Sequence, residues 1–343
     1  MSETLSARRQ AILVLGMHRS GTSALTRVLG LCGAALPERL MDAAPEVNER
    51  GFWEPREIVA LHEEALEAAG SVWHDIRPLP GPWFESAAAA AFRQRLAALL
   101  DEEFGTAALP VVKDPRLCRL LNLWLPVLGT LDIAPCVVIP VRNPLEVAAS
   151  LRQREGFGAA KWLMLWLGHF LAAERESREL PRCFVTYEQI LTDWRSVVER
   201  IGAVLGIAWP RAPGAAAPEI EAFLSGALRH HARSDDALDD TVPVWIRDVY
   251  DWALAACRGA EPDGAALDRI GAEMAGTMAA FGPVIGELDG EIERKSAELR
   301  RWIDVAVERY ALIEQLQTVA ATRETARPTG TLQAMLHRLR GKS

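Results

Sequence analysis

The segment at residues 11–29, AILVLGMHRSGTSALTRVL, constrains the fold of this chain more than any other. Its apolar start predicts a buried strand, the turn from Gly16 to Ser23 predicts a tight loop, and the apolar residues after it predict a helix. Such a unit directs a row of backbone N–H groups toward one point, and the helix dipole adds positive potential there. The segment therefore predicts an anion-binding site at the start of the helix.

The spacing of the loop narrows the kind of anion. It follows GxxxxG and then TS, the spacing of nucleotide-phosphate loops, but Thr22 stands where such ATPases and GTPases carry lysine. Phosphoryl transfer normally combines that lysine with Mg²⁺, whereas a sulfuryl group carries less charge and can be transferred with side chains alone. The cations of this loop would be Arg19 and His18. An ordinary glycine turn without a ligand is the simpler alternative.

Composition limits the class of protein. A chain of 343 residues with 50% hydrophobic content can bury a large core, which suits one α/β domain with an appended region. The formal net charge of -8 argues against a nucleic-acid or membrane-surface binder. Five scattered cysteines without a CxxC pair indicate neither a zinc site nor a disulfide framework. With no signal-peptide pattern and no apolar run long enough to span a bilayer, we expect a cytoplasmic protein.

Residues 36–57 form a loop-rich stretch that carries Glu54 between aromatic residues and a proline. A carboxylate beside Phe52 and Trp53 in a partly desolvated cleft would have a raised pKa, which suits a general base. A solvated carboxylate beside two packing aromatics is an equally good interpretation of this segment.

A helix is predicted at residues 58–69, and it carries His62 among acidic residues, with His74 and Asp75 in the next loop. Histidine near carboxylates suggests a metal site, but the HExxH spacing of such sites is missing. The pattern therefore favours solvated helix charges, and we predict no metal.

The second predicted strand, at residues 109–112, runs directly into Lys113 and Asp114. Open α/β sheets place ligand chemistry at the carboxyl ends of their strands, so Lys113 would point its ammonium toward a group held by the first loop. Asp114 would either orient this lysine or cap the helix that starts at Pro115.

Two further strands are predicted at residues 136–141 and 183–186. Arg142 ends the first of them, and Ser150 lies eight residues later in a helix, where an arginine fork and a hydroxyl can bind a second phosphate. Tyr187 ends the other strand, and its ring would stack on a purine or serve in packing. The alternation of strands and helices predicts a parallel sheet.

The chain changes character beyond residue 207. Residues 209–220, WPRAPGAAAPEI, suggest a connector. A basic cluster follows at residues 229–231, where its positive charge would either interact favourably with the dipole at a helix C-terminus or close over a phosphate of the ligand. Helices are predicted at 244–257 and 265–281. Beyond Pro283, apolar residues recur three and four positions apart, interrupted by Lys295, so a coiled coil, a helix packed on its own domain and a docking arm all stay open.

Four motifs now stand in the chain order of a sulfotransferase: GMHRSGTS, VVKDPR, VRNPLEVAAS and VTYEQIL. Residues 12–205 thus resemble a bacterial-type sulfotransferase domain, whose donor is 3′-phosphoadenosine 5′-phosphosulfate (PAPS). The resemblance implies a P-loop NTPase-like, three-layer α/β/α fold with a central parallel sheet and a helical C-terminal extension. We expect the core at residues 1–210, a helical continuation at 211–283, and an amphipathic helix or coiled-coil arm with a basic tail at 284–343.

The resemblance also implies roles for residues. The loop would hold the 5′-phosphosulfate, and Arg142 and Ser150 would hold the 3′-phosphate. The KDP and RNP segments, together with Arg154, are similar to those of the tyrosylprotein branch of the sulfotransferase family. By that similarity Lys113 would stabilise the leaving group and Glu54 would be the base. The lysine before SGT and the histidine base of the cytosolic branch are missing here, so His62 or His18 could substitute as base. The candidate donor-binding residues are His18, Arg19, Ser20, Gly21, Thr22, Ser23, Arg142, Ser150, Arg154 and Tyr187, and the candidate catalytic residues are Glu54, Lys113 and Arg19.

The sequence thus predicts in-line transfer of a sulfuryl group from PAPS to a hydroxyl acceptor, without a metal. Trp53, Trp73 and Trp83 lie in the loops that would contact the acceptor and favour a carbohydrate such as a cell-surface glycan. A phosphotransferase or NTPase using the same loop is one alternative. A non-enzymatic nucleotide-binding scaffold is another, with the C-terminal helix recruiting a partner or a second copy of the chain.

Overall fold

The computed structural model describes residues 9–42, 51–155, 158–225, 238 and 241–325. Packing groups the chain into two units, residues 1–279 and residues 280–343. The basic cluster at residues 229–231 and the basic tail lie outside the described residues. The finer division at residues 210 and 283 stays a prediction.

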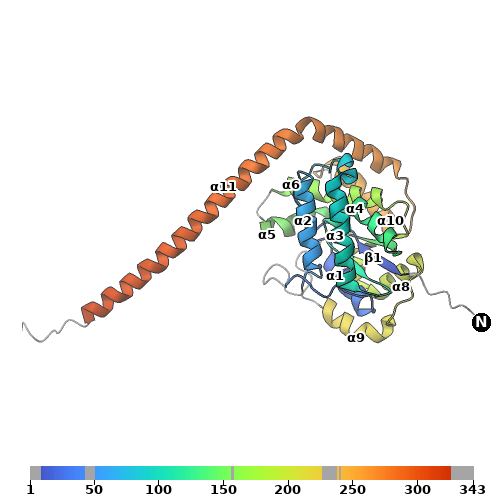
Figure 1. Cartoon of the computed structure of the whole chain (residues 1–343), viewed down its shortest axis with the longest axis horizontal. Coiled ribbons are helices and arrows are strands. Elements are labelled where there is room, and N and C mark those ends of the chain that lie inside the picture. Colours follow the sequence, from blue (N-terminus) through green and yellow to red (C-terminus); the bar gives the residue numbers. More distant parts are fainter. Residues whose placement is uncertain (1–8, 43–50, 156–157, 226–237, 239–240, 326–343) are drawn as a thin grey trace, which may run out of the picture. The chain divides into compact units, whose positions relative to one another are not determined.

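A central sheet of four parallel strands has the order β2-β1-β3-β4 (Figure 1). In register, Val14 of β1 lies opposite Lys113 of β2 and Val138 of β3, while Val141 of β3 lies opposite Thr186 of β4. The strands are β1 (Gln10–Val14), β2 (Val111–Lys113), β3 (Ala134–Val141) and β4 (Arg182–Thr186). The predicted strands are confirmed, and because all four run in the same direction, their carboxyl ends meet at one edge of the sheet.

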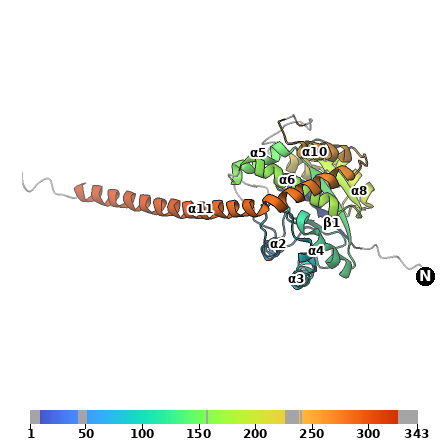
Figure 2. The same ribbon diagram turned by 90° about the horizontal axis from the view of Figure 1, so that it is seen from above.

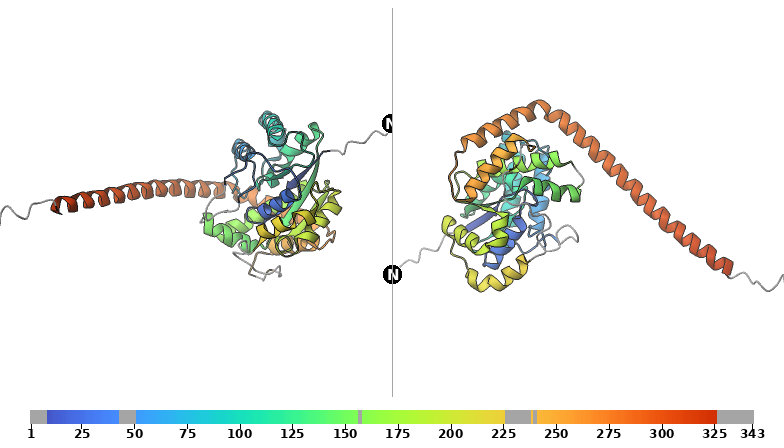
Figure 3. Two further views of the ribbon diagram at one scale, coloured as in Figure 1. Left: turned by 90° about the horizontal axis from the view of Figure 1, so that it is seen from below. Right: turned by 180° about the vertical axis from the view of Figure 1, so that it is seen from behind.

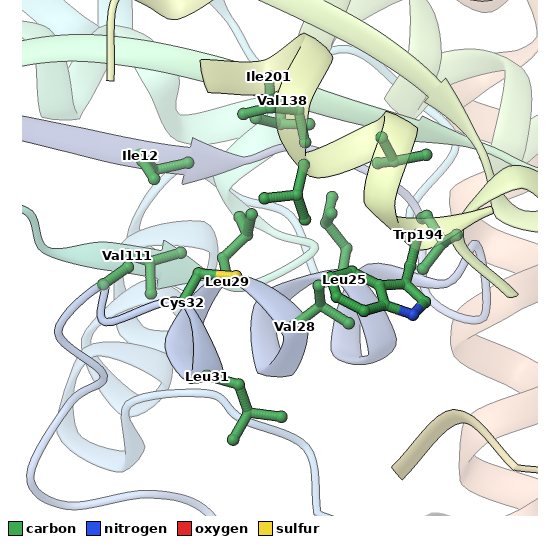
Figure 4. Close-up of a cluster of buried hydrophobic side chains, with 14 of the residues drawn as sticks. Ile12, Leu25, Val28, Leu29, Leu31, Cys32, Val111, Val138, Trp194 and Ile201 are labelled. Atoms are coloured by element: carbon green, nitrogen blue, oxygen red, sulfur yellow. The ribbon is translucent and has the colours of Figure 1, made fainter. Parts of the chain in front are cut away.

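One face of the sheet packs on α1 (Thr22–Leu31), α8 (Trp194–Leu205) and α9 (Pro213–Leu224). Alternate strand residues point to this side, as the period of a pleated strand requires, and Ile12 and Val138 meet the apolar stripe of α1 (Figure 4). The yellow α9 lies against the blue α1 (Figure 3). This buried cluster fixes the start of α1 beneath the edge where the strands end.

The opposite face carries α4 (Leu117–Thr130), α6 (Ala159–Glu176) and α10 (Val244–Cys257). Two further helices, α2 (Arg56–Ala68) and α3 (Ala87–Phe104), pack beside α4 (Figure 2). The short elements are η1 (Gly81–Glu85), α5 (Pro144–Glu155) and α7 (Tyr187–Thr192). The arrangement is helix, sheet and helix, so the predicted three-layer fold is confirmed.

Residues 209–220 are not the connector that the prolines suggested, because α9 begins at Pro213. Proline suits the first position of a helix, where its missing N–H would have no partner in any case. Burial of Ala216, Ala217 and Ile220 against α1 and α8 then stabilises the helix in spite of Pro218 in its interior.

The helix predicted to end near residue 281 continues without a break. α11 spans Ala265–Thr325, with Pro283 inside it (Figure 1). A proline in a helix interior costs about 3 kcal/mol, and the long run of good helix formers on both sides outweighs that penalty. None of the helices in the described ranges is long and apolar enough to cross a membrane.

Candidate functional site

The loop between β1 and α1 depends on left-handed backbone at two positions. Arg19 has φ 69° and Gly21 has φ 87°. A Cβ at Gly21 would lie 2.3 Å from Cδ2 of Tyr187, so only glycine allows this approach. The backbone N–H of Ser20 donates to the carbonyl of Met17 at 3.2 Å and closes the turn. The loop is thereby folded tightly over the start of α1.

The hydrogen-bond donors at the start of α1 have no side-chain cap among the described residues. The first N–H groups of any helix have no partner inside it. The hydroxyl of Ser20 is 2% exposed and likewise has no hydrogen-bond partner among the described residues. Because an unpaired buried hydroxyl is costly, these groups together fit the oxygens of a bound anion such as a phosphosulfate.

A second group of predicted residues joins this loop from β3, α5 and α7. Arg19 Nε donates to Ser150 Oγ at 2.8 Å, and Arg142 Nη1 donates to the carbonyl of Arg19 at 2.9 Å. The Arg142 guanidinium lies 4.5 Å from the centre of the Tyr187 ring, and burial raises the pKa of that tyrosine. Arg142 Nε also donates to Glu146 Oε2 at 2.8 Å. Glu146 was not among the predicted residues, although its position four residues after Arg142 on a helix is a recognisable ion-pair spacing.

The third group is a buried ion pair beside the loop. Lys113 Nζ pairs with the carboxylate of Glu54 and also donates to Ser23 Oγ at 3.3 Å and to the carbonyl of Phe52 at 3.2 Å. Lys113 and Glu54 are each 3% exposed. Burial raises the pKa of Glu54, and the charge of Lys113 opposes that rise. The interpretation of Glu54 as a solvated loop carboxylate is therefore wrong.

His62 is buried, so the interpretation of it as a solvated helix charge is also wrong. Trp124 Nε1 donates to His62 Nε2 at 2.8 Å, and because indole is only a donor, that ring nitrogen must be the acceptor. The other nitrogen, Nδ1, then carries the proton and donates to Asp114 Oδ2 at 2.7 Å. Both nitrogens of His62 are engaged inside the protein, which excludes it as the substitute base.

Asp114 binds His62 and Arg116 rather than Lys113 among the described residues. Its Oδ1 accepts from the backbone N–H of Arg116 at 3.0 Å and from Arg116 Nη1 at 2.8 Å. Burial disfavours the charged carboxylate, but the charge of Arg116 and the hydrogen bond from His62 outweigh burial and hold its pKa below the ordinary value. Of the two predicted roles, the structure thus favours holding the backbone before α4 over orienting the lysine.

The three tryptophans have separate surroundings. Trp73 contacts His18 of the loop edge-on at 4.9 Å and stacks on Trp162 at 6.1 Å. Trp53 lies under the Arg27 guanidinium at 4.6 Å. Trp83 packs instead on Phe84 and Phe92, at 5.2 and 6.3 Å.

The side chain of Arg154 lies outside the described part of the structure. Within the described ranges, His, Cys, Asp and Glu side chains form no group of three that could hold a metal ion.

Comparisons with known proteins were made on the sequence and on the fold. A sequence model of the sulfotransferase family matches residues 11–211. No curated protein sequence gave a significant match. The similar solved structures include three sulfotransferases. The sulfotransferase domain of the Synechococcus PCC 7002 olefin synthase has 16% identity and a TM-score of 0.41, with 71% of this chain and 93% of that chain covered. The sulfotransferase domain from the curacin biosynthetic pathway has 14% identity and a TM-score of 0.37, with 79% and 99% covered. The sulfotransferase STF1 from Mycobacterium tuberculosis H37Rv has 16% identity and a TM-score of 0.33, with 79% of this chain and 77% of that chain covered.

Because the family match spans more than half of the chain and contains the loop and all four strand ends, this chain belongs to the sulfotransferase family.

Proposed function

We propose that this enzyme transfers a sulfuryl group from PAPS to a hydroxyl group of its acceptor. The observation that carries the proposal is the loop. Its backbone donors have no side-chain cap and its buried Ser20 hydroxyl has no partner among the described residues, while Arg19 joins the loop to Ser150. In this assignment residues 19–23 receive the 5′-phosphosulfate. Arg142 and Ser150 receive the 3′-phosphate, with the charged fork that suits phosphate recognition. A doubly phosphorylated donor explains both groups, whereas ATP explains only the first.

Glu54 accepts the proton of the acceptor hydroxyl in this proposal. The hydroxyl oxygen forms a new bond to sulfur as the bond between sulfur and the bridging oxygen breaks, and negative charge develops on that oxygen. Lys113, Arg19 and the loop amides stabilise the charge. The raised pKa of Glu54 supports its role, because a general base is most effective when its pKa approaches the working pH. Its contact with Lys113 keeps the base beside the residue that would neutralise the leaving group.

A carbohydrate is the acceptor class that we propose. Trp73 contacts the loop residue His18, and Trp53 directly precedes Glu54 in the chain, which supports an acceptor that binds indole rings. Flat aromatic surfaces with a polar edge suit the apolar faces and hydroxyls of a sugar.

For α11 we propose self-association. Ile292, Leu299 and Ile313 are separated by multiples of seven residues and are about half exposed within their own unit. Charged residues alternate with them along the helix. A heptad seam of this kind is buried most simply by the same seam of a second copy.

The test is binding of 3′-phosphoadenosine 5′-phosphate, the product of the donor, compared with ATP plus Mg²⁺. A ligand at a hundred times its Kd stabilises a protein by about 2.7 kcal/mol, which a thermal-shift assay resolves. We expect the adenosine bisphosphate to stabilise the chain and ATP to have little effect. Stabilisation by ATP and Mg²⁺ alone would instead support a phosphotransferase. Binding of the bisphosphate without transfer of labelled sulfate to any of a panel of glycans would support a non-enzymatic scaffold.

A further inference from the structure

A cavity of about 620 Å³ lies in the first unit, apart from the loop site. Its walls come from residues 75–85, from α3, α4 and α6, and from the start of α11. Neither the loop residues 16–23 nor Glu54, Lys113 and Arg142 line it. The volume falls within the range of about 300 to 1,000 Å³ in which proteins bind small molecules.

Charges of both signs line this cavity, with Asp75, Glu85 and Glu176 among them, and two of its arginines, Arg93 and Arg119, bind no carboxylate among the described residues. Arg93 lines the wall and donates through Nη2 to the carbonyl of Phe84 at 2.6 Å, while its Nε is buried and has no hydrogen-bond partner among the described residues. Among the described residues, Arg119 donates to uncharged acceptors, namely the carbonyls of Val72 at 2.8 Å and Arg77 at 3.0 Å and the hydroxyl of Ser71 at 2.9 Å. Burial lowers the pKa of Arg119 to about 10, so it stays charged at physiological pH. Two half-buried guanidinium groups with neutral partners favour an anion.

A buried hydrogen-bond acceptor lies in the same wall. His169 is 2% exposed, and its Nδ1 must donate to the carbonyl of Leu165, 2.8 Å away. Nε2 is therefore the acceptor nitrogen, and it has no partner among the described residues. Burial lowers the pKa of this histidine to about 3, so the ring is neutral and cannot become a donor at physiological pH. A buried acceptor of this kind is satisfied by an O–H or N–H group that reaches it from the cavity.

Apolar side chains form one part of the wall. Leu125 of α4, Met164 and Leu165 of α6, and Met274 and Ala275 of α11 contribute to it. Methionine side chains adapt to irregular apolar shapes, so this part of the wall suits a hydrocarbon body without a fixed outline.

We propose that this cavity binds an amphipathic hydroxy acid. The acidic group pairs with Arg93 in the positive potential that Arg119 supports. The hydrocarbon body lies between α4, α6 and α11, and a hydroxyl donates to Nε2 of His169. The site is independent of the donor assignment, because it shares no residue with the loop.

The experiment uses calorimetric titration of the full chain with 10-hydroxydecanoate, decanoate and 1,10-decanediol. We expect the hydroxy acid to bind at one site per chain, and the other two probes at least tenfold more weakly because each lacks one polar group. Arg93→Met weakens the hydroxy acid at least tenfold. The matched control is Arg95→Met on the same helix, whose guanidinium pairs with the exposed Glu64 outside the cavity and whose loss leaves binding unchanged.

A second variant tests the cavity without removing a charge. A Cβ at Gly271 meets no atom within 4 Å, so Gly271→Phe can place its ring in the cavity without a backbone clash, and it removes a glycine from a helix. We expect this variant to fold and to lose the hydroxy acid. Undiminished binding in Gly271→Phe or Arg93→Met would overturn the proposal, as would the absence of binding to the unmodified chain.

Saturating 3′-phosphoadenosine 5′-phosphate separates this site from the donor loop. We expect the affinity for 10-hydroxydecanoate to stay the same in its presence. Competition between the two would place the acid at the donor site and overturn the inference while leaving the sulfotransferase assignment intact. Equal binding of decanoate and 10-hydroxydecanoate would overturn the role of His169.

Discussion

The buried pair of Lys113 and Glu54 provides a quantitative test of the site. Each side chain of the pair is 4% exposed. Removing one partner of such a pair leaves an uncompensated buried charge, which costs about 3 to 5 kcal/mol. Lys113→Met should therefore lower the free energy of unfolding by about that amount at pH 8. Replacing both partners, in Lys113→Met/Glu54→Gln, leaves no buried charge and should recover much of the loss.

The cost of Lys113→Met should depend on pH in a defined direction. Burial already raises the pKa of Glu54 above its ordinary value near 4.5, and loss of the lysine removes the charge that opposes that rise. At pH values between the pKa of Glu54 in the unfolded state and its pKa in the folded state, the folded protein binds a proton at Glu54 that the unfolded protein has lost. Stability is therefore greatest below the unfolded pKa and falls as pH rises toward the folded pKa. The variant should be closer to the unmodified protein at pH 5 than at pH 8, and the double variant should lose this dependence.

The assay is denaturant unfolding followed by tryptophan fluorescence at both pH values. The matched control is the exposed pair of Arg95 and Glu64, which are 51% and 52% exposed, and whose removal should change stability little. If Lys113→Met were no more destabilising than Arg95→Met, the pair would not be buried in the folded protein. If the double variant were as unstable as the single one, the loss would come from packing rather than from an unpaired carboxylate.

Three further predictions concern the loop, the second phosphate group and α11. Gly21→Ala combines a left-handed φ with a contact of 2.3 Å to Tyr187, so it should lower the free energy of unfolding in urea by at least ~2 kcal/mol and weaken binding of 3′-phosphoadenosine 5′-phosphate. The control Gly259→Ala, at φ 86° with no atom within 4 Å, should show only the smaller cost of backbone strain, and equal effects of the two variants would contradict the close approach of Tyr187. In Arg142→Lys the new side chain cannot bind Glu146, the Arg19 carbonyl and the Tyr187 ring at once. Calorimetry should therefore show the affinity for 3′-phosphoadenosine 5′-phosphate reduced about tenfold or more, and full affinity would exclude Arg142 from the donor site. The double variant Ile292→Lys/Leu299→Lys should shift sedimentation of the full chain toward the monomer, whereas the control Val307→Lys, which lies off the heptad, should not. An unmodified chain that sediments as a monomer would rule out the self-association.

The alternation of strands and helices predicted the sheet and its layers because apolar runs and glycine turns are local signals. Local signals failed at Pro218 and Pro283, where a proline suggested a break in a segment that is helical. At α9 the outcome depended on burial against α1 and α8, which no local pattern contains. At α11 the helix formers on both sides outweigh a single unfavourable residue.

The roles of His62 and Asp114 also depended on distant partners. Asp114 was identified as polar at a strand end, but its contact with His62 required α2 to be packed near the start of α4. Trp124, which fixes the tautomer of His62, lies 62 positions further along the chain. A residue-by-residue interpretation therefore left His62 as a solvated charge, although it is among the most buried polar side chains.

The sequence by itself determined the loop, since GMHRSGTS specifies where glycine, hydroxyl and cation stand relative to the helix start. It also placed a polar residue at the end of each following strand, and parallel strands bring those ends together. Only the tertiary structure decided which of these residues touch. Lys113 meets Glu54 and Ser23, Arg19 meets Ser150, and the cavity beside His169 forms between helices far apart in sequence. The physical reason is that backbone conformation follows from neighbours along the chain, whereas burial and ion pairing follow from neighbours in space.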